Sequence, residues 1–376
     1  MRPKGTLQAR MLPLAQALAR RGHTLQIVAP PTLNPEDAGQ CVELDGVQVL
    51  HTRLPRLGGP VGVLEQAALL RHAALAPQPD MVHLFKPKGF GGLAVLAMPQ
   101  TIPFVLDSDD WEGWGGWNDL LPYPWPARLL FAWQERTLPT RAQAVTVASR
   151  TLERQVRGFG VAPQRVFYLP NGTEARRVAV LGKNEQGDAR PPTLLVYTRF
   201  WEFEIAGLVA ALVGIASRYP HVRVLVVGRG ERGEERELAR LMQHAGIGEL
   251  LDYRGWVESQ HLPQLLASAD IALAPMDNTL INRARGLAKL LELMELGLPI
   301  VASRVGQAAA YLEHGQSGWL VEPGDTGALA AGALSVLDDT SLRERLAGGA
   351  RRAAQRFAWD ALACVAEEAY RASVES

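Results

Sequence analysis

The residues with the clearest capacity for chemistry in this 376-residue chain lie in the segment Asn282–Ser303. Lys289 and Glu292 are three residues apart there, so a helix presents both side chains on one face. The free N–H groups and partial positive charge of a helix N-terminus suit a diphosphate, and a carboxylate further along can accept hydrogen bonds from ribose hydroxyls. The simpler alternative is an exposed salt bridge between Lys289 and Glu292 without any ligand. The Gly297-Leu-Pro299 stop and the apolar strand after it favour the binding interpretation.

A second reactive segment, Asp107–Trp117, combines carboxylates with aromatic rings. Sugar sites use this combination, because rings stack on the CH faces of a sugar while carboxylates bond to its hydroxyls. A carboxylate here can act as a base or stabilise an oxocarbenium-like transition state. Two alternatives stay open: the tryptophans pack internally or anchor a loop at a membrane surface, and the Asp107-Ser-Asp109 sequence binds a divalent metal.

The motif Asp80-x-x-His83 ends a predicted strand and runs into Lys86-Pro87-Lys88-Gly89. His83 is a candidate catalytic residue, with a satisfied core histidine as the alternative. The chain contains only 5 lysines against 34 arginines, so lysines at a motif position are conspicuous.

Composition limits the function classes. The formal net charge is zero, which argues against a nucleic-acid partner. The two cysteines have no metal-like spacing, so we expect a cytoplasmic protein. No apolar run reaches the roughly 18 residues of a membrane span.

Short apolar strands alternate with amphipathic helices through most of the chain, which predicts an α/β fold of two Rossmann-like, doubly wound parallel sheets. The expected first-half strands are Leu25–Ala29, Val47–His51, Met81–Leu84, Pro103–Leu106, Ala144–Val147 and Val166–Leu169. The expected second-half strands are Thr193–Tyr197, Val222–Val227, Leu251–Tyr253, Ile271–Ala274, Pro299–Ala302 and Trp319–Val321.

The predicted domains are residues 1–180, residues 181–355 and a terminal helix over residues 356–376. Such a domain normally opens with a strand, whereas this chain starts at the turn Met1–Gly5 and enters a helix at once. The first strand of the N-terminal domain is therefore missing, and we expect the true start of the protein to lie upstream.

Several glycine-rich segments occur in a characteristic order: Leu169-Pro-Asn-Gly172, Leu225-Val-Val-Gly-Arg-Gly230, Arg254-Gly-Trp-Val257 and His314–Asp325. Together with Asn282–Ser303, they make the chain resemble the GT-B glycosyltransferases of family four, which are retaining and use nucleotide diphosphate sugars. The resemblance covers most of the chain. It implies that the two sheets face a common cleft and that the terminal helix crosses back to the first domain.

The resemblance also implies roles for individual residues. Arg199 matches an arginine that clamps the donor phosphates, but the partner lysine of the family falls on Glu204, and the first glutamate of a conserved pair falls on Ala284. The implied donor-binding residues are Arg199, Gly228, Asn282, Lys289 and Glu292. The implied acceptor-binding residues are Gly5, Trp111, Glu112, Trp114 and Asn171, and the candidate catalytic residues are His83, Asp109 and Asp110.

The predicted function is therefore transfer of a hexose, with retention, from a nucleotide diphosphate sugar to a glycan, a lipid-linked or a small-molecule acceptor, as in polysaccharide biosynthesis. No metal or other cofactor is expected, and the protein is placed in the cytoplasm, with peripheral contact at the inner membrane surface left open. One alternative is a non-catalytic nucleotide-sugar binder or complex subunit, because Glu204 and Ala284 depart from the family. A GT-B epimerase or a dinucleotide-dependent enzyme is the other.

Overall fold

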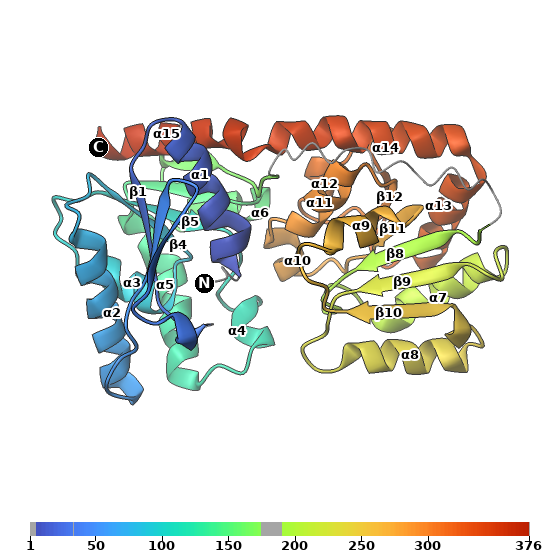
Figure 1. Cartoon of the computed structure of the whole chain (residues 1–376), viewed down its shortest axis with the longest axis horizontal. Helices are drawn as coiled ribbons and strands as arrows, with labels where there is room; N and C mark the ends of the chain where they lie inside the picture. Colours follow the sequence, from blue (N-terminus) through green and yellow to red (C-terminus); the bar gives the residue numbers. More distant parts are fainter. Residues whose placement is uncertain (1–4, 33, 174–189, 376) are drawn as a thin grey trace. The chain divides into compact units, whose positions relative to one another are not determined.

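The computed structural model describes residues 5–32, 34–173 and 190–375. They form two compact units, shown in Figure 1. Unit 1 contains the described residues 5–173, 284–286 and 358–375, and unit 2 contains residues 190–283 and 287–357. The predicted boundary between residues 180 and 181 lies outside the described residues.

Unit 2 is built on a six-stranded parallel sheet of order β10-β9-β8-β11-β12-β13. Its strands are β8 Thr193–Tyr197, β9 Arg223–Val227, β10 Leu251–Gly255, β11 Ile271–Ala274, β12 Ile300–Ser303 and β13 Trp319–Val321. Its helices are α7 Ile205–Ala216, α8 Glu234–His244, α9 Leu262–Ala267, α10 Leu280–Ala284, α11 Ala288–Leu296, α12 Ala308–Tyr311, α13 Thr326–Asp338 and α14 Thr340–Ala354.

Both faces of this sheet are buried, which explains why its strands are apolar at nearly every position. Successive residues of a strand point to opposite faces. Leu194 and Val196 therefore enter a core with α7, α8 and α13, whereas Leu195 enters a second core with α9, α11 and α14. This is the doubly wound arrangement that the sequence predicted.

Unit 1 holds two smaller sheets, of order β1-β3-β2 and β4-β5-β6-β7. Their strands are β1 Leu25–Ala29, β2 Cys41–Leu44, β3 Val47–His51, β4 Val82–Phe85, β5 Phe104–Ser108, β6 Ala144–Val147 and β7 Val166–Tyr168. Its helices are α1 Leu12–Arg20, α2 Gly59–Leu75, α3 Gly89–Leu96, α4 Trp117–Leu120, α5 Trp125–Arg141, α6 Arg150–Gly158 and α15 Trp359–Val374. A π-helical turn, Leu7–Met11, precedes α1. All pairs are parallel except β2 with β3, and β2 was not predicted.

Unit 1 is divided into two sheets that share no strand pair among the described residues. Among the described residues, no strand pairs with the outer edge of β1 or of β4. Residues of β1 and β4 are mostly half-buried, whereas those of β6 are all buried. Leu25 of β1 and Phe85 of β4 both pack against the apolar core that α1 and α15 form.

The terminal helix α15 belongs to unit 1, although its first residue, Trp359, lies 186 positions after Thr173, the last described residue of the first segment. Trp359, Ala363 and Ala366 are buried against α1. The backbone N–H of Trp359 donates to the carbonyl of Thr173 at 3.0 Å, which ties the helix to the end of the first segment.

One predicted helix is interrupted. The sequence suggested a continuous helix from Asn282 to Leu296, but the chain breaks between α10 and α11, where Leu287 takes a left-handed conformation with φ +46°. The predicted stop at Gly297 is confirmed, with φ +66°. Within the described part of the chain, no helix has the length and apolar character needed to cross a bilayer.

Candidate functional site

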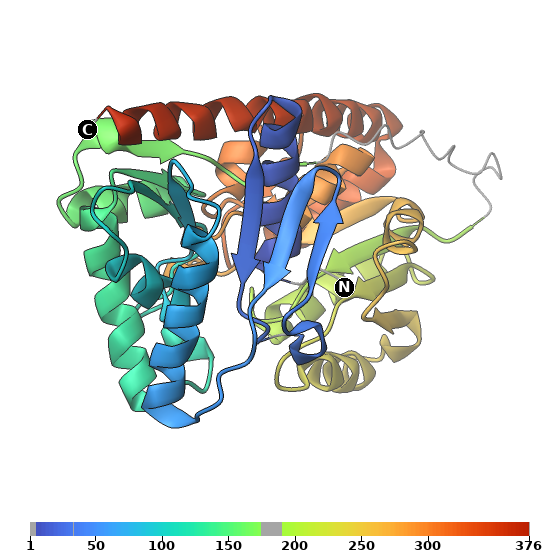
Figure 2. The same ribbon diagram turned by 60° about the vertical axis from the view of Figure 1, so that its left-hand side comes forward.

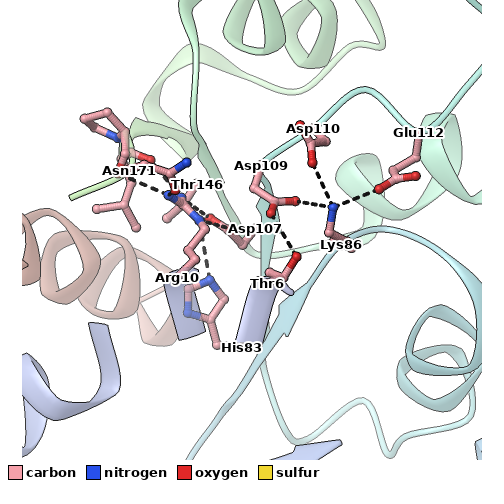
Figure 3. A network of polar contacts seen from close by, with 12 residues as sticks. Thr6, Arg10, His83, Lys86, Asp107, Asp109, Asp110, Glu112, Thr146 and Asn171 are labelled. Carbon is pink, nitrogen blue, oxygen red and sulfur yellow. Dashed lines mark hydrogen bonds and ion pairs between the residues drawn. The ribbon is translucent and has the colours of Figure 1, made fainter. Parts of the chain in front are cut away.

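A cluster of lysines and carboxylates lies at the carboxyl ends of β4 and β5 in unit 1 (Figure 3). The Lys86 ammonium is 3.3 Å from Asp109 Oδ1, 3.0 Å from Asp110 Oδ2 and 2.9 Å from Glu112 Oε1. Lys88 contacts the other oxygen of Glu112. The carboxyl ends of neighbouring parallel strands meet at one edge of a sheet, which is why residues about 24 positions apart converge here.

The backbone at Lys86 is strained, because this non-glycine residue has φ +67°. Such a conformation costs about 1–3 kcal/mol and persists where the surroundings impose it, often at a functional site. The ammonium of the same residue contacts three carboxylates. Burial lowers the pKa of Lys86, but Asp109, Asp110 and Glu112 outweigh burial and hold the pKa well above its ordinary value. Lys86 is therefore a fixed positive charge.

Asp109 is a carboxylate of this cluster with a raised pKa. Burial raises its pKa to about 6, with Asp110 and Asp107 adding to the rise and Lys86 opposing it. Its Oδ2 accepts a hydrogen bond from Thr6 at 3.4 Å, next to the predicted residue Gly5, which has φ +60°. A carboxylate with a pKa near the pH of the cell can take up and release a proton there.

A buried ion pair between Arg10 and Asp107 lies next to this cluster (Figure 3). The Arg10 guanidinium binds both oxygens of Asp107 at 2.6 Å and donates to the carbonyls of Leu169 and Pro170. Burial alone would raise the pKa of Asp107, but Arg10 outweighs it and lowers that pKa. Since Arg10 occupies both oxygens of Asp107, the Asp107-Ser-Asp109 sequence does not present two free carboxylates to a metal.

His83 belongs to this supporting network, not to the lysine cluster. Its Nδ1 lies 2.9 Å from the hydroxyl of Tyr370, and its Nε2 lies 3.4 Å from Thr146 Oγ1, which also donates to Asp107. Burial lowers the pKa of His83 to about 4, so the ring is neutral at pH 7. Both ring nitrogens have partners inside the unit, which gives His83 a positioning role in this network, and its catalytic role stays a prediction.

The predicted acceptor residues of unit 1 divide into buried and exposed ones. Trp111 is buried, and its Nε1 donates to the carbonyl of Trp114 at 2.7 Å, so Trp111 packs the loop. Glu112 is buried between the lysines. Asn171 accepts a hydrogen bond from Arg10 at 3.0 Å. Gly5 is exposed, and Trp114 is 41% exposed.

The corresponding cluster of unit 2 lies at the start of α11. The left-handed Leu287 ends the preceding turn, so the helix begins at Ala288 and Lys289 falls in its first turn. The Lys289 ammonium lies 4.4 Å from the centre of the Tyr197 ring, and the Tyr197 hydroxyl donates a hydrogen bond to Glu292. The helix break therefore places a helix N-terminus, a lysine and a carboxylate together.

The loop after β8 is held by a buried carboxylate, Glu202. It accepts hydrogen bonds from the hydroxyl of Thr198 at 2.9 Å and from the backbone N–H of Arg199 at 3.1 Å. The Arg199 side chain is exposed. Gly228 faces the same loop, and a Cβ at this position would lie 1.8 Å from the carbonyl oxygen of Thr198, so only glycine fits.

Asn282 is buried and acts on the backbone. Its amide nitrogen donates to the carbonyls of Glu202 and Asp277, so neither amide hydrogen remains for a ligand. Asn282 thus holds the loop after β8 in place, and its contact with the donor stays a prediction. Glu204, where the family has a lysine, is exposed, and its backbone N–H donates to the Asp277 carboxylate.

Sequence reasoning did not assign Arg10, Tyr197 or Glu202 to the site. Arg10 is one of 34 arginines and lies in an apolar helical pattern, which gives no sign of a buried partner. Tyr197 ends a predicted strand next to Arg199, and this position was the available signal. Lys86 and Lys88 could have been assigned from the scarcity of lysine.

Among the described residues, no group of three or more side chains that could bind a metal ion occurs.

Two family models match the chain. Residues 5–172 match a glycosyl transferase 4-like domain, and residues 191–339 match the glycosyl transferases group 1. The chain is 24% identical to the phosphatidyl-myo-inositol mannosyltransferase of Mycobacterium leprae, over 96% of this chain and 91% of that protein. It is 35% identical to a D-inositol 3-phosphate glycosyltransferase of Geodermatophilus obscurus, over 58% of this chain but only 49% of that protein.

Solved structures share the whole fold at low identity. HepE from Anabaena, in complex with UDP and glucose, gives a TM-score of 0.71 at 21% identity, over 99% of this chain and 98% of that chain. Sucrose-phosphate synthase from Thermosynechococcus elongatus gives 0.70 at 20% identity, over 95% and 91%. The two family models cover both units, and the fold agrees with them. The chain therefore belongs to the GT-B glycosyltransferases and resembles their family four.

Proposed function

We propose that the protein transfers a hexose from a nucleoside diphosphate sugar to an acceptor hydroxyl with retention at the anomeric carbon. The cluster of Lys289, Glu292 and the N-terminus of α11 carries this proposal. In it, the helix N-terminus and Lys289 bind the diphosphate, with the exposed Arg199 beside them, and Glu292 accepts hydrogen bonds from ribose hydroxyls. HepE, a structural neighbour, was solved with UDP and glucose, which supports this class of donor.

In this proposal unit 1 binds the acceptor. Asp109 acts in its ionised form, either as base for the acceptor hydroxyl or beside the positive charge that develops at the anomeric carbon. Lys86 holds the Asp109 carboxylate in place. The bond from the anomeric carbon to the diphosphate breaks, a bond to the acceptor oxygen forms, and the acceptor proton leaves with the nucleoside diphosphate or on Asp109. Arg199, Lys289 and the helix N-terminus supply the positive charge that the leaving group needs, so no resident metal is proposed.

The test is release of nucleoside diphosphate from a panel of nucleotide sugars, with polyols, inositol phosphates and glycolipids as acceptors. We expect one donor to be turned over, with activity unchanged by EDTA and the product keeping the donor's anomeric configuration. Binding of a donor without release across all acceptors would instead support a non-catalytic nucleotide-sugar binder, which Glu204 and Ala284 favour as the second candidate.

Glu292→Ala is expected to weaken donor binding about 10- to 100-fold, because it removes hydrogen bonds from a charged acceptor that are each worth roughly 1.5–3 kcal/mol. Isothermal titration with the donor that is turned over measures the effect. The matched control is Glu322→Ala, which removes a glutamate of unit 2 that is 74% exposed and outside the cluster. Equal affinities of the two variants would refute the ribose role.

Glu204→Lys is expected to tighten donor binding by about fivefold to tenfold, since it replaces a repelling carboxylate with the cation that the family carries there. The gain should shrink as salt is added, because the side chain is exposed. Glu249→Lys, at the far end of β10, makes the same charge change away from the site. If both variants tighten binding equally, net charge is the cause and Glu204 does not face the phosphates.

A further inference from the structure

Large apolar side chains are exposed along one helix of unit 1. Trp125 is 61% exposed, Leu129 49% and Trp133 45%, all on α5, and Trp114 in the preceding loop is 41% exposed. We call these four residues the Trp125 surface. Exposed tryptophans are uncommon on protein surfaces that face only water, since each leaves a large apolar area uncovered. A group of them marks an interaction surface.

The helical repeat makes the surface continuous. Residues 125, 129 and 133 recur every four positions, so they form one stripe along α5. The opposite side of the helix is buried through Gln134, Glu135 and Leu138. Helix α5 thus packs one side into the unit and presents large apolar side chains on its solvent side.

Cations border the Trp125 surface. The Arg128 guanidinium lies 4.8 Å from the centre of the Trp114 ring and 5.9 Å from that of Trp125. Arg136 is exposed and lies eleven positions after Trp125, three helical turns along the same stripe. Asp119 of α4 pairs with Arg128 next to this surface.

A second exposed apolar segment begins at the same end of unit 1. Leu57, Val61 and Leu64 are 58%, 56% and 63% exposed at the start of α2. Helices α2 and α5 begin at the same end of the unit in both views (Figures 1 and 2). The segments over residues 53–72 and 121–141 together contain six arginines and two glutamates, in a chain whose net charge is zero. One of the glutamates, Glu135, is buried.

We propose that the Trp125 surface docks unit 1 onto an anionic lipid bilayer. Tryptophan and leucine on one helix face with arginines at its border suit the boundary between headgroups and acyl chains, where rings insert and guanidinium groups meet phosphates. The excess of arginine over carboxylate gives the charge complementarity that an anionic surface needs. Inter-copy association through the same residues is the competing outcome of the test.

The surface adjoins the lysine–carboxylate cluster through one loop. Glu112 of that cluster precedes Trp114 by two residues, and Lys88 donates to the hydroxyl of Tyr123, two residues before Trp125. A bilayer bound at the Trp125 surface would therefore present its headgroups close to Lys86 and Asp109. The docking itself does not depend on the proposed sugar transfer, because binding can be measured without any donor.

The test is co-sedimentation of the full chain with vesicles of phosphatidylcholine containing one-quarter phosphatidylglycerol, and with vesicles of phosphatidylcholine alone. We expect binding to the anionic vesicles that high salt weakens. The double variant Trp125→Ser with Trp133→Ser should bind at least about tenfold more weakly, since two apolar rings no longer insert into the bilayer interface.

Trp256→Ser is the matched control, because Trp256 in unit 2 is 79% exposed and outside the surface. Both variants should keep the melting temperature of the parent protein, because the rings that they lose are exposed. Equal vesicle binding by the double variant and the parent would overturn the proposal. So would absence of binding to anionic vesicles together with a concentration-dependent dimer that the double variant loses, which would assign the surface to contact between copies.

Discussion

Replacing Arg10 with leucine is expected to lower the free energy of unfolding of unit 1 by about 3–5 kcal/mol, the usual loss when one partner of a buried ion pair is removed. Arg10 is 1% exposed and Asp107 is fully buried. The variant leaves the Asp107 carboxylate without its bidentate partner and the carbonyls of Leu169 and Pro170 without a donor. Thermal unfolding followed by circular dichroism should show a melting temperature lower by roughly 10 °C.

The effect should depend on pH in a defined direction. The folded protein lowers the pKa of Asp107, so the pair contributes stability above the carboxyl's ordinary pKa and loses it as pH falls through the lower folded value. In the Arg10→Leu variant the isolated carboxyl can protonate on acidification. The difference in the free energy of unfolding between the parent and Arg10→Leu should therefore be greatest near pH 7 and shrink below about pH 4.

A surface pair in the same unit gives the control. Arg20 binds Asp360 with side chains that are 57% and 64% exposed, and exposed pairs contribute only about 0–1 kcal/mol. Arg20→Leu should therefore melt close to the parent protein. Should Arg10→Leu melt at the same temperature as Arg20→Leu, the buried pair would not support unit 1 in the way we describe.

The elements of the fold could be predicted because their signals are local. Thr193–Tyr197 and Ile271–Ala274 are continuous apolar runs between helical patterns, and the structure gives strands with these same bounds. β2 was missed because Cys41–Leu44 is a short edge strand that alternates half-buried and exposed residues. The break at Leu287 was missed because it depends on a left-handed backbone at a residue that ordinarily continues a helix.

The candidate site could be predicted in part, for the same reason. Asp109 follows the end of a predicted strand, and the strand ends of a parallel sheet meet at one edge of that sheet. Lys86 follows the neighbouring strand but was not assigned to the site from the sequence. The roles of His83 and Arg10 could not be predicted, since each depends on distant partners. The partner of His83 is Tyr370, 287 residues along the chain, and Arg10 contacts Asp107 across 97 residues. Nothing near either residue in the sequence indicates those contacts.

Asp109→Asn is expected to reduce the rate of sugar transfer by about 100-fold or more, the usual contribution of a positioned acid or base. The variant keeps the size of the side chain and removes its charge. Donor affinity should stay unchanged, because Asp109 lies in unit 1 and the proposed donor site lies in unit 2. A fall in the catalytic rate without a change in donor Kd would thus separate Asp109 from Glu292.

The parent enzyme should lose activity as pH falls through about 6, because burial raises the pKa of Asp109 to that value and the proposed role needs the ionised form. The residual activity of Asp109→Asn should not show this fall at acidic pH. Lys86→Met removes a charge that lowers the pKa of Asp109. In this variant the fall in activity should therefore occur at a higher pH than in the parent. Asp119→Asn, which changes a carboxylate that is 45% exposed, should keep the parent profile. A fall in activity that stays near pH 6 in both Asp109→Asn and Lys86→Met would assign the titration to another group.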